Sequence, residues 1–409
     1  MFIKLAYKSL LHRKVSVLLI ILAMSVSIFV LLGVEHIRHQ TKVNFNNSIS
    51  NVDLIVGARS GKLNLLLYSV FRIGTPTSNI GWQSYKRLSY HRAVDWVIPI
   101  SLGDSHKGFR VLGTTASYFK HYRYGNAQTI KLNEGKVFTH VLDVVLGSKV
   151  AKELNYEIGD KITLSHGVGK TSFSHHDHLA FRVTGIIAPT GTPIDQTLHV
   201  SLQGIEAVHI PNAHQILSNQ STELASLEEN TLTPKSITAA MVGLKSRMLI
   251  FQLQRSINTN PTEPLMAILP GATLSEFWQS LSVMENALRL ISSLIVFSAM
   301  LGLSAMLLTS IRERKQEINL LRMIGASSLF IFYFIQLEAL FIAVASVVVA
   351  TLSLYLSLSL AQAFLIEQYG LSISTNFFTT NTLLSIGTLL VFSLLSAIPA
   401  SLKVNKMNE

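Results

Sequence analysis

The chain has no cysteine among its 409 residues, and only 14% of its residues are charged. The missing thiol excludes disulfide frameworks, thiolate zinc sites, iron–sulfur clusters, a cysteine nucleophile and a lipidated cysteine. Soluble domains contain roughly 25% charged residues, whereas this chain is 49% apolar with a mean hydropathy of +0.40. A disordered chain would need low hydrophobicity and many charges. The composition is that of a membrane protein with a soluble part.

Catalytic motifs are also missing from the sequence. Residues 167–171 (GVGKT) partly match a phosphate-binding loop, but that motif requires a glycine at position 164, where Leu164 stands. The sequence contains no Gly-x-Ser-x-Gly, no His-Glu-x-x-His and no paired catalytic carboxylates. We therefore expect that this chain is not an enzyme and binds no cofactor of its own.

Four apolar stretches are long enough to span a bilayer, which takes about 20 helical residues. They cover residues 15–34, 288–311, 329–361 and 381–400. The sequence therefore predicts four transmembrane helices, arranged as one followed by three.

The basic residues of the short segments indicate the orientation of these helices. They precede the first stretch, separate the second from the third, and follow the fourth (Lys4, Lys8, Arg13, Lys14; Arg312, Arg314, Lys315, Arg322; Lys403, Lys406). The short loop 362–380 contains neither lysine nor arginine. Because positive loops stay in the cytoplasm, we expect both termini and segment 312–328 inside, with residues 35–287 outside. Much of the +11 net charge then reflects topology, and nucleic acid is not an expected partner.

The predicted cytoplasmic ends differ in character. Residues 1–14 have apolar side chains at helical spacing with lysines on the other side, which predicts an amphipathic helix in the membrane interface. The alternative is a frayed tail. Residues 401–409 are expected to form a short cytoplasmic tail.

The large outside segment alternates short apolar runs with turn residues, which is typical of an α+β domain with one or two subdomains. A helix is expected over 148–154, ended by Asn155, and a polar linker over 217–234. The expected strands include residues 52–56, 143–146, 161–164 and 181–187.

Both ends of the outside segment are predicted to be helical stalks. Pro270 and Gly271 end the preceding element, and Thr273 with Glu276 has capping-box spacing. One helix is then expected from 274 to 311, about 57 Å long, matched by residues 35–47 after the first span. The alternative is a bend near Asn286.

Segment 312–328 is the candidate docking element. Ile318, Leu321 and Ile324 form a short apolar stripe, and Gly325 is suited to end a helix. A short amphipathic helix of this kind fits a groove on a soluble partner. The alternative is a basic loop that only sets the topology.

The spans contain two further features. Glu338 is the clear acidic group within them, and a structural bond inside its own subunit is favoured over a proton site. Ser298, Gly302 and Ala305 form a small-residue face suited to packing on a twin subunit. Packing within one subunit is the alternative for that face.

A histidine run in the outside segment is the one candidate metal site. His176 and His178 face one side if the segment is extended, beside His175, and imidazoles are ligands for zinc. His166 is near in sequence, and His199, His209 and His214 are further candidates for proximity in space. The alternative is a solvated loop that carries a chance run of histidines.

This arrangement resembles the MacB/FtsX/LolC-type (type VII, mechanotransmission) permeases of ABC transporters. The most specific part is 312–327, which is similar to the family's R-x-R-E-I-x-x-L-R-x-x-G-A-S coupling helix. In the outside domain, 143–147, 159–163 and 181–186 are similar to the family's periplasmic core. The C-terminal end keeps Pro399 and Ala400 of the family pattern but is short and less basic. The coupling residues implied here are Arg312, Glu313, Arg314, Glu317, Ile318, Leu321, Arg322 and Gly325.

The resemblance implies an α-helical membrane protein with four transmembrane helices and a large α+β periplasmic domain inserted between the first and second. It also implies a bacterial inner-membrane permease homodimer bound to two copies of a separate ATPase, which holds ATP and Mg. Cargo is left open among lipoproteins, peptides, drugs and metal-linked molecules. The alternatives are an FtsX-like scaffold that activates a periplasmic partner, a component of a zinc-uptake system, and an independent channel or carrier.

Overall fold

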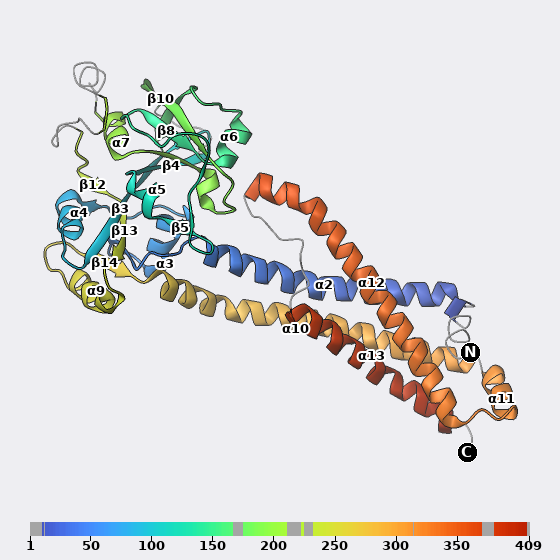
Figure 1. The fold of residues 1–409 in the computed structure, drawn as a ribbon. Coiled ribbons are helices and arrows are strands. Elements are labelled where there is room, and N and C mark those ends of the chain that lie inside the picture. The colour runs from blue at the N-terminus through green and yellow to red at the C-terminus, as the bar shows by residue number, and fades with distance from the viewer. Residues whose placement is uncertain are drawn as a thin grey trace. The chain divides into compact units, whose positions relative to one another are not determined.

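The computed structural model describes residues 10–11, 13–166, 175–210, 222–224, 232–313, 315–369 and 380–406. The chain divides into two compact units. The helical unit comprises Met1–Thr41, Leu281–Phe364 and Ile373–Glu409. The mixed unit comprises Lys42–Ser280 and Leu365–Ser372. Figure 1 labels their elements along the chain.

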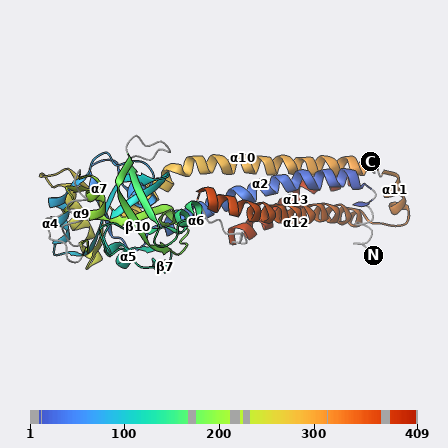
Figure 2. The ribbon, with the colours of Figure 1, turned by 90° about the horizontal axis from the view of Figure 1, so that it is seen from above.

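Four long helices dominate the helical unit (Figures 1 and 2). Each is long and apolar enough to cross a membrane, so the chain is a multi-pass membrane protein. They are α2 (Lys14–Asn47), α10 (Pro270–Glu313), α12 (Ser328–Tyr369) and α13 (Thr380–Lys406), with the short helix α11 (Lys315–Met323) between α10 and α12.

A shared apolar core holds these four helices together. Val17 and Met24 of α2 pack with Leu303 and Leu307 of α10. Both α12 and α13 add to the same cluster through Ile331, Ile335, Ala339, Ile342, Ala343, Ala397 and Ala400. Small residues on α13 allow close approach of its backbone, which is the usual means of helix packing inside a membrane.

Two predicted helix ends need correction. Helix α12 continues to Tyr369, because no glycine or proline occurs before Gly370, so residues 362–369 are helix rather than loop. Helix α13 continues to Lys406, so 401–406 are not a free tail. The predicted N-terminal amphipathic helix falls mainly outside the described residues, as do 370–379 and 407–409.

Helix α10 is continuous from Pro270 to Glu313, through Asn286. Its start differs from the expected capping box. The Thr273 backbone N–H donates to the Leu269 carbonyl at 3.0 Å, which places Thr273 inside the first turn. Proline at the first helical position has a suitable φ and lacks an N–H that would be unpaired there. Helix α2 likewise continues past the predicted span to Asn47.

The mixed unit is built on a ten-stranded sheet of order β14-β1-β13-β3-β4-β11-β8-β10-β7, with β9 paired to β10 and β3. Strand β3 connects its two halves, because residues 94–100 pair with β13 and residues 101–106 pair with β4 and β9. The sheet mixes parallel and antiparallel pairs, in agreement with an α+β domain. The strands are β1 (Leu54–Ala58), β3 (Val94–His106), β4 (Phe109–Thr114), β7 (Leu132–Gly135), β8 (Asp143–Leu146), β9 (Lys161–His166), β10 (His175–Ile187), β11 (Thr197–Ser201), β13 (Ala239–Leu244) and β14 (Leu265–Ile268).

Short helices pack on this sheet. The expected helix over 148–154 is present, and Asn155 ends it in the left-handed conformation at φ 50°. The predicted linker over 217–234 lies largely outside the described residues. The helices are α3 (Lys62–Leu66), the π-helix η1 (Leu67–Phe71), α4 (Trp82–Ser89), α5 (Ser117–His121), α6 (Ser148–Leu154), η2 (Pro193–Gln196), α7 (Leu202–Val208), η3 (Arg247–Leu249) and α9 (Ile250–Asn258).

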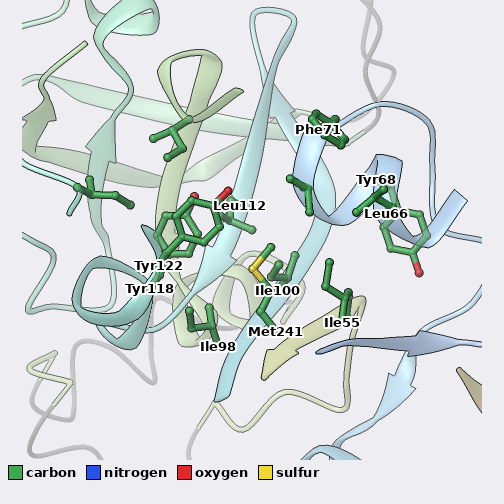
Figure 3. Close-up of a cluster of buried hydrophobic side chains, with 14 of the residues drawn as sticks. Ile55, Leu66, Tyr68, Phe71, Ile98, Ile100, Leu112, Tyr118, Tyr122 and Met241 are labelled. Atoms are coloured by element: carbon green, nitrogen blue, oxygen red, sulfur yellow. The ribbon is translucent and has the colours of Figure 1, made fainter. Parts of the chain in front are cut away.

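The largest core of the mixed unit includes the stacked rings of Tyr118 in α5 and of Tyr122, which directly follows α5 (Figure 3). The Tyr118 and Tyr122 ring centroids lie 4.9 Å apart, and the Tyr122 hydroxyl donates to the Ser48 carbonyl just beyond α2.

The last turns of α2 and the first turns of α10 pack on this same core. Phe45 of α2 lies 4.5 Å from Phe71 and 5.5 Å from Trp278 of α10, measured between ring centroids. Both helices are therefore held at one aromatic cluster inside the mixed unit.

Candidate functional site

The candidate site begins at α11, which connects two long membrane helices. Gly325 ends this helix at φ +100°, a conformation that side chains with a Cβ rarely adopt. Its N–H donates to the Arg322 carbonyl at 2.9 Å, and the Ile324 N–H donates to the Leu320 carbonyl at 3.1 Å. Glycine therefore supplies the left-handed residue that stops α11.

Ser327 starts the next helix two residues later. Its hydroxyl accepts a hydrogen bond from the Phe330 N–H at 3.2 Å, which satisfies one of the free amide donors at the start of α12. The Gly-Ala-Ser sequence thus determines where one helix ends and the next begins. It ends α11 and caps α12 within three residues.

The two sides of α11 have different environments. Ile318 packs against the core of the helical unit, whereas Leu320, Met323 and Ile324 are 53%, 78% and 79% exposed. The predicted stripe is therefore wrong in part, because Ile318 and Ile324 are six positions apart, about 120° around a helix. Leu320, Met323 and Ile324 have i, i+3, i+4 spacing and share one face.

The remaining predicted coupling residues are placed unevenly. Arg312 and the Glu313 side chain are exposed, and Arg322 is half-buried with an interaction of its own. Arg314 and the side chains of Glu317 and Leu321 lie outside the described residues, so their roles stay predictions.

Arg13 contacts the last turn of α10. Its guanidinium donates to the Ser310 hydroxyl and, at 3.1 Å, to the Ser310 carbonyl, and lies 3.9 Å from the Glu313 carboxylate. A cation at a helix C-terminus is favourable because the last carbonyls are unpaired and carry partial negative charge. Sequence reasoning assigned Arg13 only to topology and missed this contact.

A second polar tie joins α2 and α10 further along. Arg38 bonds Glu285 at 2.8 Å and Glu35 at 2.5 Å, and Arg289 lies 3.7 Å from Glu35. The Arg38 and Glu285 side chains are only 22% and 16% exposed. The sequence signal was the pair of opposite charges just after one predicted span and just before the next.

Glu338 is buried within the helical unit, with 4% of its surface exposed, and it makes a polar or electrostatic interaction. Its role as a structural bond rather than a proton site stays a prediction.

The predicted small-residue face on α10 is uncovered. Ser298, Gly302 and Ala305 are exposed, and no described atom lies within 4 Å of a Cβ built at Gly302. A groove of about 340 Å³ runs beside Ser298 and Gly302 between α2 and α10. Residues of α2, including Ile20, Ala23 and Ser27, form the other wall of this groove, so the choice between a twin subunit and packing within one subunit stays a prediction.

The histidine run lies at the start of β10. His175 pairs with Ser165 of β9 through the backbone, so the segment is extended as expected. The side chains of His175, His176 and His178 lie outside the described set, and their metal role stays a prediction. Elsewhere, the described residues contain no group of three potential ligands able to hold a metal ion.

His199 is not a partner for that run. It pairs with Val145, which pairs with Gly185, ten positions along β10 from His175 and so roughly 30 Å away. Its ring is fully buried, 5.3 Å from the Tyr118 ring, and neither ring nitrogen has a hydrogen-bond partner among the described residues. This burial lowers the pKa of His199 to about 3, so the ring is neutral at pH 7. His209 directly follows α7, and its Nε2 lies 3.9 Å from the Asp104 carboxylate. Asp104 pairs with His166 of β9, and the adjacent Ser165 pairs with His175, so His209 lies beside the strands that carry His166 and His175.

Two protein-family models match most of the chain. The family described as MacB-like periplasmic core domain matches residues 15–259, and the FtsX-like permease C-terminal family matches residues 289–408. The chain belongs to the MacB/FtsX-type permease family. Members of this family are the membrane subunits of ABC transporters, work with ABC ATPases, dimerise and are not themselves catalytic.

Two solved structures are similar to parts of this chain. The periplasmic region of MacB from Actinobacillus actinomycetemcomitans is 13% identical over 56% of this chain and 94% of that one, with a TM-score of 0.36. The extracellular domain of the noncanonic ABC-type transporter YknZ from Gram-positive bacteria is 11% identical over 53% and 98%, with a TM-score of 0.30. Comparison with curated proteins gave no match.

Proposed function

We propose that this permease couples ATP hydrolysis by a separate cytoplasmic ABC ATPase to movement of its periplasmic domain on periplasmic or membrane-extracted cargo. The observation that carries this proposal is α10, a single helix of 44 residues that starts in the mixed unit and ends beside α11. A helix transmits displacement along its axis because its backbone hydrogen bonds resist bending and stretching.

Polar and aromatic contacts support transmission through α2 and α10 together. Arg13 holds the start of α2 to the last turn of α10, and Arg38 holds the two helices at Glu285. Phe45 and Trp278 then pack within the mixed unit. A displacement of α11 would therefore move α2 and α10 together, because these two helices contact each other at several points along their length.

The exposed face of Leu320, Met323 and Ile324 is the docking surface we assign to the ATPase. Glutamate at Leu320 and Met323 adds two charges that would be desolvated on binding. We expect the double variant Leu320→Glu/Met323→Glu, purified from native membranes, to lose a co-purifying ATPase that wild type retains. Met248→Glu is the matched control, since Met248 is 91% exposed in the mixed unit. Retention of the ATPase by the double variant, or its absence from wild type in an intact membrane complex, contradicts the proposal.

The orientation follows from the basic residues around α11 and the N-terminus. We infer that the protein lies in a bacterial inner membrane with both termini in the cytoplasm and the mixed unit in the periplasm. Two copies of the ATPase and two of the permease form the assembly, with Ser298, Gly302 and Ala305 of α10 at the twofold contact. Their exposure in one subunit supports this contact.

Cargo is proposed only as a class: a lipoprotein, peptide, drug or metal-linked molecule. A scaffold that activates a periplasmic partner uses the same mechanics and differs in binding an enzyme rather than cargo. Membership of a zinc-uptake system rests on the histidine run alone. It predicts that His176→Ala/His178→Ala removes zinc bound by the purified wild-type chain, whereas His91→Ala does not.

A further inference from the structure

A cleft of about 390 Å³ lies in the mixed unit, and neither α11 nor the histidine run contributes to its lining. Five segments line it: the last turns of α2, the residues after η1, the turn between β3 and β4, helix α6, and the loop that leads through η2 into β11. All of them belong to the mixed unit, so the cleft is formed within one compact body.

Two arginines face this cleft from different elements. Arg72 follows the π-helix in the left-handed conformation at φ 60°, and its guanidinium donates to the Ser69 carbonyl. Arg110 lies on β4 opposite Thr197, and its guanidinium donates to the Gly74 carbonyl at 2.8 Å. A π-turn and a left-handed non-glycine residue are uncommon and occur often at functional sites.

The charge of this arginine pair is not balanced. Neither Arg72 nor Arg110 has a carboxylate within 4.0 Å among the residues that the structure describes, whereas Lys149 pairs with Glu153 at 3.3 Å. Partial burial and the nearby Arg72 charge lower the pKa of Arg110. Two guanidinium groups therefore share a partly desolvated site, and among the described residues the carboxylate that lines it, Glu153, is paired with Lys149 instead.

The rest of the cleft combines aromatic rings with polar side chains, and part of its wall is held by internal hydrogen bonds. Phe45, Phe71 and Phe109 supply aromatic surface beside the arginines. The loop on the opposite side is held by Asp195, which accepts from the Gly191 N–H at 2.7 Å and the Thr190 N–H at 2.9 Å. A ligand thus meets a fixed wall rather than a loop that must first be ordered.

We propose that this cleft binds an anionic amphiphile, with a phosphate or carboxylate between Arg72 and Arg110 and an apolar part against Phe45 and Phe109. Guanidinium groups match the geometry of both anions, and a negative group relieves the repulsion between the two arginines. The assignment does not depend on an ATPase partner. Because Phe45 belongs to α2, the bound ligand touches the helix that continues into the membrane unit.

The test uses the full chain in phosphatidylcholine nanodiscs, with octyl phosphate as the probe and octyl glucoside and inorganic phosphate as comparisons. We expect saturable binding of octyl phosphate by calorimetry, with binding of the other two probes weaker by about tenfold or more. Arg110→Gln and Arg72→Gln each weaken octyl phosphate binding by about tenfold or more. Arg255→Gln, an exposed change on α9, leaves it unaltered.

Several results overturn the assignment. One is octyl phosphate binding by Arg110→Gln that equals binding by wild type. Another is wild-type binding of octyl glucoside as tight as that of octyl phosphate, which would show that the anion is not needed. The third is wild-type binding of inorganic phosphate as tight as that of octyl phosphate, which would show that the apolar part is not needed. Arg110→Gln keeps the test valid if Arg72→Gln fails to fold, because β4 pairs through its backbone. Mass spectrometry of the anion released from protein purified from native membranes then distinguishes the source. If the released anion is a phospholipid, the ligand comes from the membrane, and if it is another phosphate or carboxylate, the ligand is cargo. In either case we expect less of the anion to co-purify with Arg110→Gln than with wild type.

Discussion

Arg38 on α2 donates a hydrogen bond to Glu285 on α10 at 2.8 Å, although the two residues are 247 positions apart in sequence. Both side chains are largely shielded from water, and Glu35 completes the pairing of the guanidinium at 2.5 Å. Arg38 lies just after the predicted span 15–34, and Glu285 lies just before the predicted span 288–311. The pair therefore fixes the axial register of two helices that side-chain packing alone would allow to slide.

Removing either partner of this pair is expected to loosen the two helices. Arg38→Gln or Glu285→Gln leaves one partly buried charge unpaired, and a double-mutant cycle should give an interaction energy of about 1 kcal/mol. Thermal unfolding of the nanodisc-embedded protein measures the cycle. ATPase stimulation should fall in both single variants, and Lys62→Gln, which breaks an exposed pair with Glu276, serves as the control. An interaction energy near zero with unchanged ATPase stimulation contradicts this role.

Gly325 and Gly271 form a matched pair of glycines. Each has open space around a built Cβ, but only Gly325 has a positive φ. Gly325→Ala is expected to cost about 1 kcal/mol of local stability at the end of α11 and to lower ATPase affinity. Gly271→Ala, in the first turn of α10, should be neutral or slightly stabilising. Equal effects of the two changes on ATPase co-purification would show that the left-handed turn is not needed.

Gly302→Leu is expected to weaken the permease dimer, because a leucine side chain prevents close approach of two α10 helices. The measurement is the monomer–dimer ratio by single-molecule photobleaching in nanodiscs. Ser293→Leu is the matched control, since Ser293 is also exposed on α10 but lies about 140° around the helix from Ser298. A dimer fraction equal to wild type places the twofold contact on another face.

His199 is expected to make the mixed unit acid-sensitive. Its pKa is about 3 when folded and 6.5 when unfolded, so the unfolded chain binds the extra proton between these values. Stability due to the neutral ring is fully present above pH 6.5 and is lost as the pH falls toward 3. From pH 7 to pH 5 the loss is about 2 kcal/mol of the free energy of unfolding.

Thermal unfolding at pH 7 and pH 5 checks this prediction. His199→Leu should flatten the pH dependence, while His91→Leu, an exposed change, should leave it as in wild type. An equally steep loss of stability in His199→Leu would assign the acid sensitivity to other groups.

The sequence predicted elements wherever the local signal was strong. The four apolar stretches, the strand over 143–146 and the helix ended by Asn155 each follow from hydropathy, alternation or a turn residue. Boundaries were less well predicted. A helix such as α12 continues as long as no residue stops it, so its end at Tyr369 is not marked by the loss of apolar residues.

Within the candidate site, the sequence located the α11 segment and Gly325 but not the exposed face. Spacing alone groups Ile318 with Ile324, but in the structure Ile318 packs against the core of the helical unit and Ile324 is exposed. The same holds for His199, whose neighbours come from other strands and from α5.

By itself the sequence determined that the chain contains four helices able to cross a membrane, and that a glycine follows the end of α11. These features depend on hydropathy and backbone preferences of consecutive residues. Only the tertiary structure decided that Arg38 meets Glu285, that Arg13 meets Ser310, and that Arg72 and Arg110 share a cleft. Such pairs join positions far apart in the chain, and packing of whole elements, rather than local propensity, sets which charges come together.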